Sequence, residues 1–164
     1  MKSKDFLKEV KLAGLTSRLK RLSDNILYST KDFYKSVDAD IEPNWHLIFL
    51  LLKESDSLTI IDISERLQLS HPAVVKIIKK MKAAGYVKTN PHSQDSRKQI
   101  LTLTPKAIQS LPKFEKYWDA CVLTMLELLE GNSTFLDSLG KIEEKINESS
   151  YKERTLNNLK NKIK

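Results

Sequence analysis

The residues best suited to bind a charged partner in this 164-residue chain are the basic side chains between Ser70 and Lys106. This stretch holds eight lysine or arginine residues, and Asp95 is its single acidic residue, so its net charge is +7. The rest of the chain has 20 basic and 20 acidic residues and is neutral overall. A compact basic patch is typical of proteins that bind a polyanion, although composition alone equally allows a solvated lysine-rich helix.

The basic patch centres on a helix predicted from Ser70 to about Ala84. Its apolar residues share one face, which can pack against a preceding helix: Val74, Ile77, Ile78 and Met81. The opposite face is basic and includes small residues: Ala73, Lys76, Lys79, Lys80 and Ala83. We expect Lys82 to lie off this exposed face. Residues 71–84 contain no acid, and small residues let a helix approach a groove floor while lysines reach phosphates. The pattern therefore favours a helix that contacts DNA over a purely structural one.

Other chemistries find little support in the sequence. There is no Gly-rich phosphate loop, GxSxG or HExxH motif, so we expect no enzyme and no cofactor. The three histidines are widely spaced and no CxxC pair occurs, so we expect no metal site. Cys121 is the single cysteine and lies among apolar residues of a predicted helix, where we expect an inert thiol.

The elements that must position the basic helix are mostly helical. Apolar spacing predicts helices over residues 5–35, 43–52, 59–67, 70–84, 105–130 and 134–147. Two strands are predicted, over residues 86–89 and 97–103, with a turn at residues 91–95 between them. The polar residues 149–164 are interpreted as either a further helix or a loose extension.

Particular residues mark where these elements begin and end. Thr59 is a predicted N-cap, reinforced by Asp62 three residues later. Gly85 stands where a helix ends in a left-handed residue. Pro112 should end or kink the helix that Pro105 opens, and Gly131 should break the chain before the next helix.

Three helices followed by a two-stranded hairpin is the winged helix-turn-helix arrangement. The fold class is therefore predicted to be mainly α (α+β), with a single domain over residues 1–164. The winged lobe spans residues 43–104. Residues 1–36 and 105–148 are predicted N- and C-terminal helical segments outside this lobe, and residues 149–164 form a polar tail.

The winged segment resembles the MarR family of multiple-antibiotic-resistance regulators over residues 59–104. The most specific match is the sequence Asp95-Ser-Arg-Lys-Gln-Ile-Leu-Thr-Leu-Thr104, which fits the family's wing pattern. Gly85-Tyr86-Val87 fits the link between recognition helix and wing. Only helix order and length agree over the wider range of residues 5–147. Ser96 departs from the pattern, because many members have a second arginine there.

This resemblance implies a double-stranded DNA site. The recognition helix that enters the major groove begins with residues Ser70, His71, Pro72, Ala73 and Lys76, and Lys79 and Lys80 continue its basic face. Arg97 corresponds to the wing arginine that reaches the minor groove, Asp95 to the acid that orients it, and Lys98 adds a further charge to the wing. His71 has two equal interpretations, a contact to a base or phosphate and a solvated turn residue.

The resemblance also implies a homodimer held by the N- and C-terminal helices. Apolar stripes suited to this purpose contain Phe6, Leu7, Val10, Phe135, Leu136, Leu139, Ile142 and Ile146. The alternative is that each stripe packs within one chain.

The expected function is a cytoplasmic transcription regulator, a repressor at a pseudo-palindromic operator. The longest apolar run is six residues, so no membrane span is expected. Family members often respond to small aromatic effectors, and Tyr28, Trp45, His46 and Phe49 are the candidate contacts, with a plain core role as the alternative. The competing function is a winged-helix module for protein or RNA contact without sequence-specific DNA readout.

Overall fold

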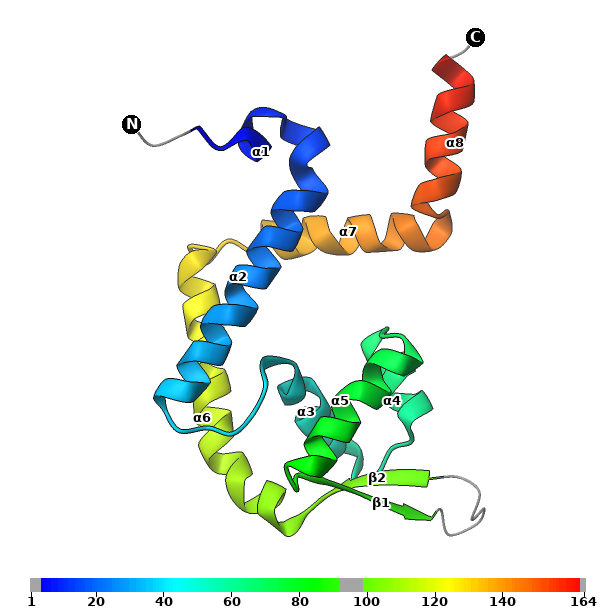
Figure 1. Cartoon of the computed structure of the whole chain (residues 1–164). Coiled ribbons are helices and arrows are strands. Elements are labelled where there is room, and N and C mark those ends of the chain that lie inside the picture. The colour runs from blue at the N-terminus through cyan, green and yellow to red at the C-terminus, as the bar shows by residue number, and fades with distance from the viewer. Residues whose placement is uncertain (1–3, 92–98, 163–164) are drawn as a thin grey trace. The chain divides into compact units, whose positions relative to one another are not determined.

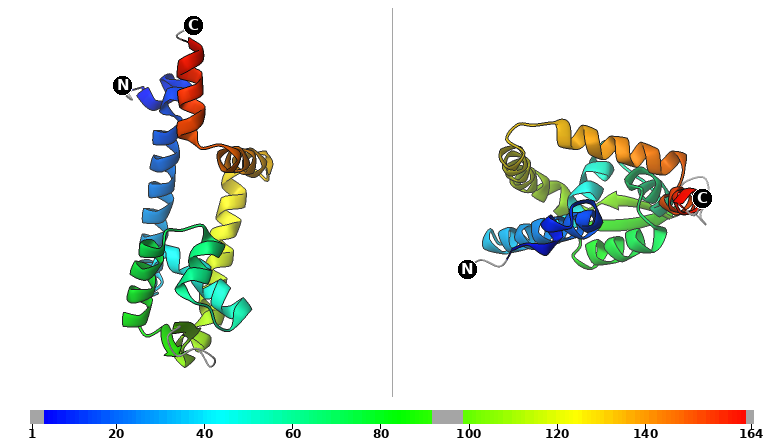
Figure 2. Two further views of the ribbon diagram at one scale, coloured as in Figure 1. Left: turned by 90° about the vertical axis from the view of Figure 1, so that its right-hand side faces the viewer. Right: turned by 90° about the horizontal axis from the view of Figure 1, so that it is seen from above.

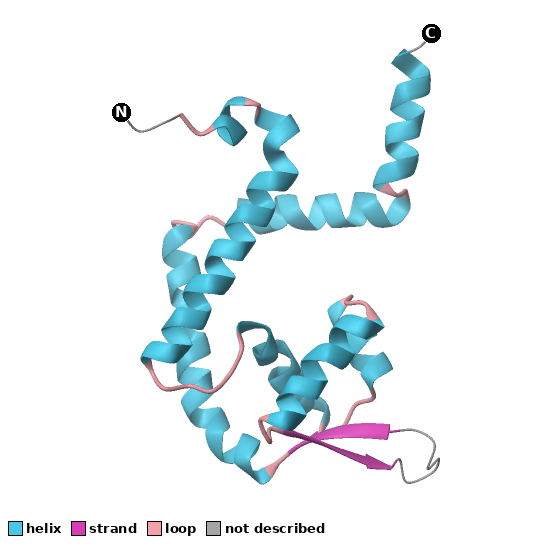
Figure 3. Cartoon of the chain, in the orientation of Figure 1, coloured by secondary structure: helices cyan, strands magenta, loops and turns pink. Residues whose placement is uncertain are grey.

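The computed structural model describes residues 4–91 and 99–162. The chain divides into two compact units, Met1–Trp118 and Asp119–Lys164. The first unit contains the winged helix, the long helix α2 (Leu15–Ser36) and the first part of α6 (Pro105–Leu128). The second contains the end of α6 with α7 (Thr134–Glu148) and α8 (Tyr151–Lys162) (Figure 1). The mainly α fold with one small sheet is confirmed (Figure 3).

The prediction of one helix over residues 5–35 is wrong at its N-terminal end. The structure has a short helix α1 (Phe6–Glu9), a 3₁₀ turn η1 (Lys11–Gly14) and the long helix α2 (Leu15–Ser36). The break begins at Lys11, whose φ of 48° is incompatible with a continuous right-handed helix.

A close backbone approach and a long-range ion pair account for this break. A Cβ atom on Gly14 would lie 2.4 Å from the carbonyl oxygen of Leu7, so only glycine fits. The Asp5 carboxylate caps α1 by accepting from the Leu7 N–H at 3.2 Å. The same carboxylate accepts two hydrogen bonds from Arg21 on α2, at 3.2 and 2.7 Å. Periodicity could not reveal these contacts, because they join residues far apart in the sequence.

The helices of the winged lobe are confirmed within a few residues. They are the 3₁₀ turn η2 (Pro43–Trp45), α3 (His46–Ser55), α4 (Ile60–Leu67) and α5 (His71–Ala83). Thr59 and Asp62 form the predicted cap of α4. The Asp62 N–H donates to Thr59 Oγ1 at 3.1 Å, and the Thr59 N–H donates to Asp62 Oδ2 at 2.7 Å. Gly85 follows α5 with a φ of 78°, as its position predicts.

The wing is an antiparallel pair of strands, β1 (Val87–Pro91) and β2 (Gln99–Leu103). Both strands are confirmed, with Pro91 at the end of β1 and not in the turn. Residues 92–95 of the predicted turn lie outside the described residues. Leu58 pairs with Leu101 through hydrogen bonds of 3.2 and 2.8 Å, which tie β2 to the chain just before α4. Figure 2 shows the two strands at one edge of the group formed by α3, α4 and α5.

Aromatic rings fill the centre of the first unit. Phe49 on α3 is fully buried, with ring centroids 5.4 Å from Tyr86 and 5.7 Å from both Phe114 and Trp118. Tyr86 immediately precedes β1, and residues of α5, the two strands and α6 belong to the same buried core. Burying rings of this size contributes a large share of a small domain's hydrophobic stabilisation.

The C-terminal part is three helices: α6 (Pro105–Leu128), α7 (Thr134–Glu148) and α8 (Tyr151–Lys162). Pro112 lies inside α6 and does not end it. Gly131, with a φ of 69°, separates α6 from α7 as predicted. The tail forms a helix, which resolves the alternative that the sequence left open.

Helix α8 begins with a clear local signal. Ser150 and Glu153 form a capping box, in which the Glu153 N–H donates to Ser150 Oγ at 3.2 Å and the Ser150 N–H donates to Glu153 Oε2 at 2.9 Å. The pKa of Glu153 is lowered because these backbone and hydroxyl groups of Ser150 donate to its carboxylate. Arg154 then reaches back to the last turn of α7 and donates to the carbonyl of Lys145 at 2.6 Å. The corner between α7 and α8 is therefore set by hydrogen bonds.

A polar clamp fixes the C-terminal end of α5 within the first unit. Tyr86 donates a hydrogen bond to Asp40, and Lys106 Nζ lies 3.1 Å from Asp40 Oδ2. Lys106 also donates to the carbonyl of Ala84 at 2.8 Å and lies 4.1 Å above the Tyr86 ring. Burial, followed by the neighbouring Asp40 carboxylate, raises the pKa of Tyr86. Burial alone would raise the pKa of Asp40, but hydrogen bonds from Tyr86 and Lys106 hold it below its ordinary value.

The clamp should make stability depend on pH. We expect Tyr86→Phe to reduce the free energy of unfolding by about 1 kcal/mol, because one hydrogen bond is lost. Because the pKa of Asp40 is lowered from 3.8 in the folded state, its contribution is present above that value and is lost as the pH falls through the lowered pKa. Urea unfolding of the wild type and Asp40→Asn at several pH values measures this effect. The stability difference should be largest near neutrality and should vanish in acid.

A matched control is Asp32→Asn, which removes an exposed carboxylate 3.0 Å from Lys35 on the same helix. We expect that change to be nearly neutral at all pH values. A difference between wild type and Asp40→Asn that stays constant down to low pH would contradict the clamp.

Candidate nucleic-acid interface

Helices α4 and α5 form a helix-turn-helix with a continuous apolar contact. Ile63 on α4 is fully buried, and so is the face of α5 that the sequence predicts to pack against it: Val74, Ile77, Ile78 and Met81. Gln68 takes a left-handed φ of 52° in the turn, and the Leu69 N–H donates to the Ser64 carbonyl at 3.0 Å. This packing fixes the rotation of α5 about its axis, and so fixes which side chains remain exposed.

The face of α5 that points away from the core is basic and free of acid. Its exposed residues are His71, Pro72, Val75, Lys76, Lys79, Lys80, Lys82 and Ala83. Two predictions are wrong in detail. Ala73 is half-buried, because it lies one helical turn before the buried Ile77, and Lys82 is exposed, because it is rotated out of the sector that Met81 occupies.

Val75 is the exposed residue that sequence reasoning missed. It is 39% exposed, whereas its neighbour Val74 is fully buried. Two consecutive valines look alike in a hydropathy pattern, so only the helical phase separates them. Ile77 and Ile78 lie three and four residues after Val74, so all three share the packing face. Val75 is therefore turned toward the lysines.

The N-terminal end of α5 has an unusual cap. Ser70 has the extended backbone of an N-cap residue, yet its hydroxyl makes no capping hydrogen bond to the helix. Its carbonyl accepts instead from the N–H groups of Ala73 and Val74, at 2.9 and 3.1 Å. The Ser70 hydroxyl and the adjacent exposed His71 are therefore available to a partner outside the helix.

The acidic groups nearest α5 lie on the segment before η2. Glu42 is 3.8 Å from Lys80 and 3.6 Å from Lys31 on α2. Within the described parts of the chain, neither Lys76 nor Lys79 takes part in an ion pair. Of the four lysines on the basic face, Lys80 is therefore partly neutralised by Glu42, and Lys76, Lys79 and Lys82 have no ion-pair partner among the described residues.

The wing residues of the predicted site, Asp95, Arg97 and Lys98, lie outside the described residues. The flanking strands are described, and Pro91 pairs directly with Gln99 where the hairpin leaves the described region.

The four candidate effector residues do not form one cluster of ring contacts. Trp45 and Phe49 are buried in the aromatic core, 4% and 0% exposed. His46 is half-buried, with Nδ1 2.8 Å from the Pro43 carbonyl oxygen and its ring 6.2 Å from Trp118. Tyr28 on α2 is 70% exposed and has no ring contact among the described residues. The indole N–H groups of Trp45 and Trp118 are buried, and neither has a hydrogen-bond acceptor in the described part of the structure.

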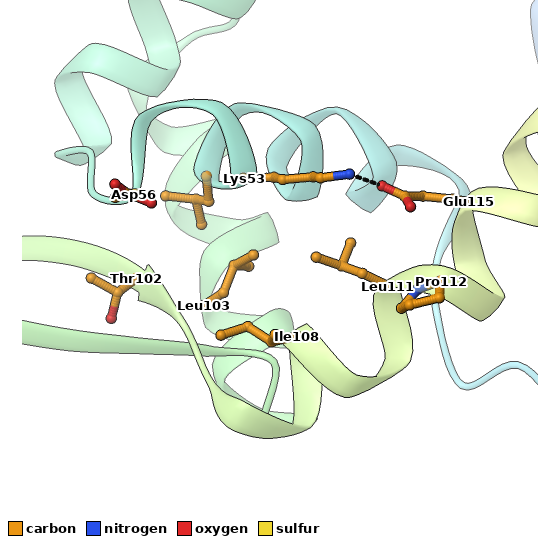
Figure 4. Close-up of a pocket in the computed structure, with 9 residues that line it drawn as sticks. Lys53, Asp56, Thr102, Leu103, Ile108, Leu111, Pro112 and Glu115 are labelled. Atoms are coloured by element: carbon orange, nitrogen blue, oxygen red, sulfur yellow. Dashed lines mark hydrogen bonds and ion pairs between the residues drawn. The ribbon is translucent and has the colours of Figure 1, made fainter.

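A surface hollow of about 380 Å³ lies elsewhere in the first unit (Figure 4). Its apolar lining comes from α3, β2 and α6: Leu52, Leu103, Ile108, Leu111 and Pro112. An ion pair between Lys53 and Glu115 stands at one side of it. None of the four candidate effector residues lines this hollow.

The single thiol, the candidate metal ligands and the hydropathy of the helices add no reactive or metal-binding site to the basic face in the described residues. Cys121 is half-buried, and burial raises the pKa of its thiol, which disfavours the reactive thiolate. The described residues contain no group of three or more side chains placed to hold a metal ion. Over the same residues, no helix is long and apolar enough to cross a membrane.

Comparison with known proteins agrees with this geometry. A sequence profile described as MarR family matches residues 39–98, which include α3, α4, α5 and β1. No curated protein sequence matched the chain.

Solved structures resemble the chain over most of its length. S. aureus MepR in a DNA complex has a TM-score of 0.70 and 20% identity, covering 80% of this chain and 97% of its own. The transcriptional repressor CouR, bound to a 23-mer DNA duplex, has a TM-score of 0.70 and 20% identity, covering 87% and 99%. The transcriptional regulator BldR from Sulfolobus solfataricus has a TM-score of 0.60 and 21% identity, covering 88% and 100%. These likenesses show a winged-helix fold, and the MarR-family profile matches the segment of the chain that holds α3, α4, α5 and β1 of that fold.

Proposed function

We propose that this protein is a transcription regulator that binds double-stranded DNA in a sequence-specific manner, with α5 in the major groove. The observation that carries the proposal is the exposed face of α5, which holds four lysines and no acid and stands on a helix-turn-helix. A helix whose inner face is fully used for packing leaves this outer face for a partner. The major groove of B-DNA is about 12 Å wide and admits one α-helix.

The main contribution of the lysines is affinity that does not depend on sequence. Lysine side chains neutralise phosphates and release counterions, so binding weakens as salt rises, with a slope near −0.9 for each phosphate neutralised. Lys76 and Lys79 have no ion pair within the described residues, and so can meet phosphates at no internal cost. Lys80 must first leave Glu42, which lies 3.8 Å away.

The wing is the second contact of this proposal. Arg97 enters the minor groove, Asp95 orients its guanidinium, and Lys98 reaches a phosphate. The supports are the wing pattern of residues 95–104 and the paired strands on either side of the loop. Arginine suits a narrow minor groove, where the negative potential is enhanced.

The regulator acts as a homodimer in this proposal. Within the second unit, no described residue from 119 to 162 is buried. Large apolar side chains on α6 and α7 are exposed there: Val122, Leu123, Met125, Leu126, Leu128, Phe135, Leu136, Leu139, Ile142 and Ile146. A monomer in water rarely leaves so many apolar side chains uncovered, and a second copy of the chain covers them in the dimer.

The N-terminal helices offer a similar surface. Exposed apolar residues on α1, η1 and α2 are Phe6, Leu12, Leu15, Leu19 and Leu22. A two-fold dimer places its two recognition helices about 34 Å apart, one turn of DNA, so the operator is a pseudo-palindrome.

Repression by occupying a promoter, with release by a small aromatic effector, completes the proposal on grounds of family likeness. The buried indole N–H groups of Trp45 and Trp118 have no acceptor among the described residues. An oxygen-bearing effector would provide one. His46, whose ring lies beside Trp118, and Tyr28 are the further candidate contacts.

Selection of bound duplexes from a random DNA pool, at fixed physiological salt, tests the function. We expect enrichment of an inverted repeat with half-sites about one helical turn apart. Salt-sensitive binding without an enriched sequence would contradict sequence-specific readout. Absence of binding would favour a winged-helix module for protein or RNA contact.

Removal of single lysines should separate free charges from paired ones. We expect Lys76→Ala to weaken binding across all sequences and to reduce the salt slope by about 1. Lys80→Ala should have a smaller effect, because Glu42 already offsets that charge. Fluorescence anisotropy at several salt concentrations measures both slopes. Lys116→Ala, which removes an exposed lysine on α6, is the matched control, and equal slopes for all three variants would argue against α5 as the phosphate-binding element.

Loss of the wing arginine should weaken binding to the operator more than binding to an unrelated duplex, unlike loss of a lysine. We expect Arg97→Ala to reduce affinity by about 1–3 kcal/mol, because a minor-groove contact is lost. The same anisotropy assay, repeated on an unrelated duplex, distinguishes this from a general charge effect. Unchanged operator affinity would remove Arg97 from the proposed interface.

A charge placed on the α7 stripe should prevent dimerisation. Leu139 and Ile142 are 36% and 47% exposed in the single chain, so Leu139→Glu and Ile142→Glu should leave the first unit folded. Each should convert a dimer into a monomer in analytical ultracentrifugation, because burial of an unpaired charge is costly. Lys141→Glu, on the same helix but off the stripe, is the control. A wild-type chain that sediments as a monomer would refute the dimer directly.

A further inference from the structure

We infer that Val75 determines part of the DNA sequence preference by contacting the 5-methyl group of thymine in the major groove. The inference rests on the proposed function and names a base chemistry for it. The thymine methyl projects into the major groove and is recognised there by apolar contact.

The first argument is what α5 lacks. Side chains that read bases by paired hydrogen bonds are arginine for guanine, asparagine or glutamine for adenine, and acids for cytosine. Residues 70–84 contain none of these five types. Lysine is the one bidentate base reader that this helix retains, and its lysines lie from residue 76 onward. Before Lys76 the helix offers only the single hydrogen-bonding groups of Ser70 and His71, so apolar contact is the main further means of reading a base there.

The second argument is the position of Val75. His71 lies four residues before it and Lys79 four residues after it, and both are exposed, so Val75 belongs to the same exposed row. Pro72 is exposed and Ala73 half-buried, and neither projects beyond the helix backbone as far as a valine does. Val75 is thus the largest apolar side chain on the outward side of the first two turns of α5.

The third argument is that Val75 lies outside the buried core that holds α5 in place. The packing face of α5 is complete without it, because Val74, Ile77, Ile78 and Met81 form that face. Val75 is absent from the buried core of the first unit. A β-branched valine on a helix has one strongly preferred rotamer, so it presents its methyl groups at little entropic cost.

The test removes the methyl group from the DNA and the side chain from the protein. The duplex obtained by selection is prepared with each half-site thymine replaced in turn by uracil, which differs from thymine only by the missing methyl. Dissociation constants are measured at fixed salt for the wild type and for Val75→Ala. We expect the wild type to lose about fourfold in affinity at one uracil position per half-site, the effect of one methyl group buried.

The Val75→Ala variant shows whether Val75 is the residue that contacts the methyl group. In Val75→Ala the loss at that same position should disappear, because the partner of the methyl is gone. Leu47→Ala is the matched control, since Leu47 on α3 is 43% exposed against 39% for Val75, and it should keep the full uracil effect. Thermal unfolding of both variants confirms that each remains folded.

The outcomes separate this inference from the function on which it rests. If the wild type binds the selected duplex and is indifferent to uracil at every position, Val75 does not read thymine although the protein is a DNA-binding regulator. If the uracil effect persists in Val75→Ala, another residue contacts that methyl. If the wild type binds no duplex at all, the proposed function fails and this inference fails with it.

Discussion

The structure depends on holding α5 firmly from one side. Val74, Ile77, Ile78 and Met81 pack into the core, and the clamp of Asp40, Tyr86 and Lys106 fixes the helix where it ends. Because the packing uses the inner face of α5 and the clamp uses its C-terminal end, the outer face is not needed to hold the helix in place. That face can therefore carry like charges whose repulsion is tolerated, since the apolar burial opposite supplies the stability.

The distribution of acidic residues follows from the same constraint. Asp40 and Glu42 lie on the segment behind the helix, where Asp40 binds Lys106 and Glu42 lies near Lys31 and Lys80. They hold the lobe together without occupying Lys76 or Lys79. An acid within α5 itself would pair with a neighbouring lysine one turn away and reduce its attraction for phosphate. Stability and binding thus draw on separate sets of charges.

The sequence predicted features that depend on contacts between residues close together in the chain. It did not predict features that depend on contacts between distant residues. Two helix ends depend on contacts within a few residues, the capping box of Thr59 with Asp62 and the left-handed Gly85. The sequence pattern therefore predicted both. The break at Gly14 depends on Arg21 reaching Asp5 and on the backbone of Leu7, which periodicity does not contain. Exposure of Val75 and Lys82 and half-burial of Ala73 depend on the rotation of α5, which only its packing sets to within one residue. The wing residues 95–98 were identified by their pattern alone.

The exposed apolar surface of the second unit bears on how such a helix can be specific. Apolar contact with one methyl group contributes about 0.8 kcal/mol, far less than the several kcal/mol that separate specific from nonspecific DNA binding. Because α5 has no arginine, asparagine or glutamine, paired hydrogen bonds from these side chains do not make up the difference within one half-site. In the proposed dimer, two copies joined through α6 and α7 would make every contact twice and would add the requirement of correct spacing. If both proposals hold, the apolar stripe on α7 and the apolar Val75 on α5 serve one purpose, because the dimer repeats weak base contacts and so makes them selective.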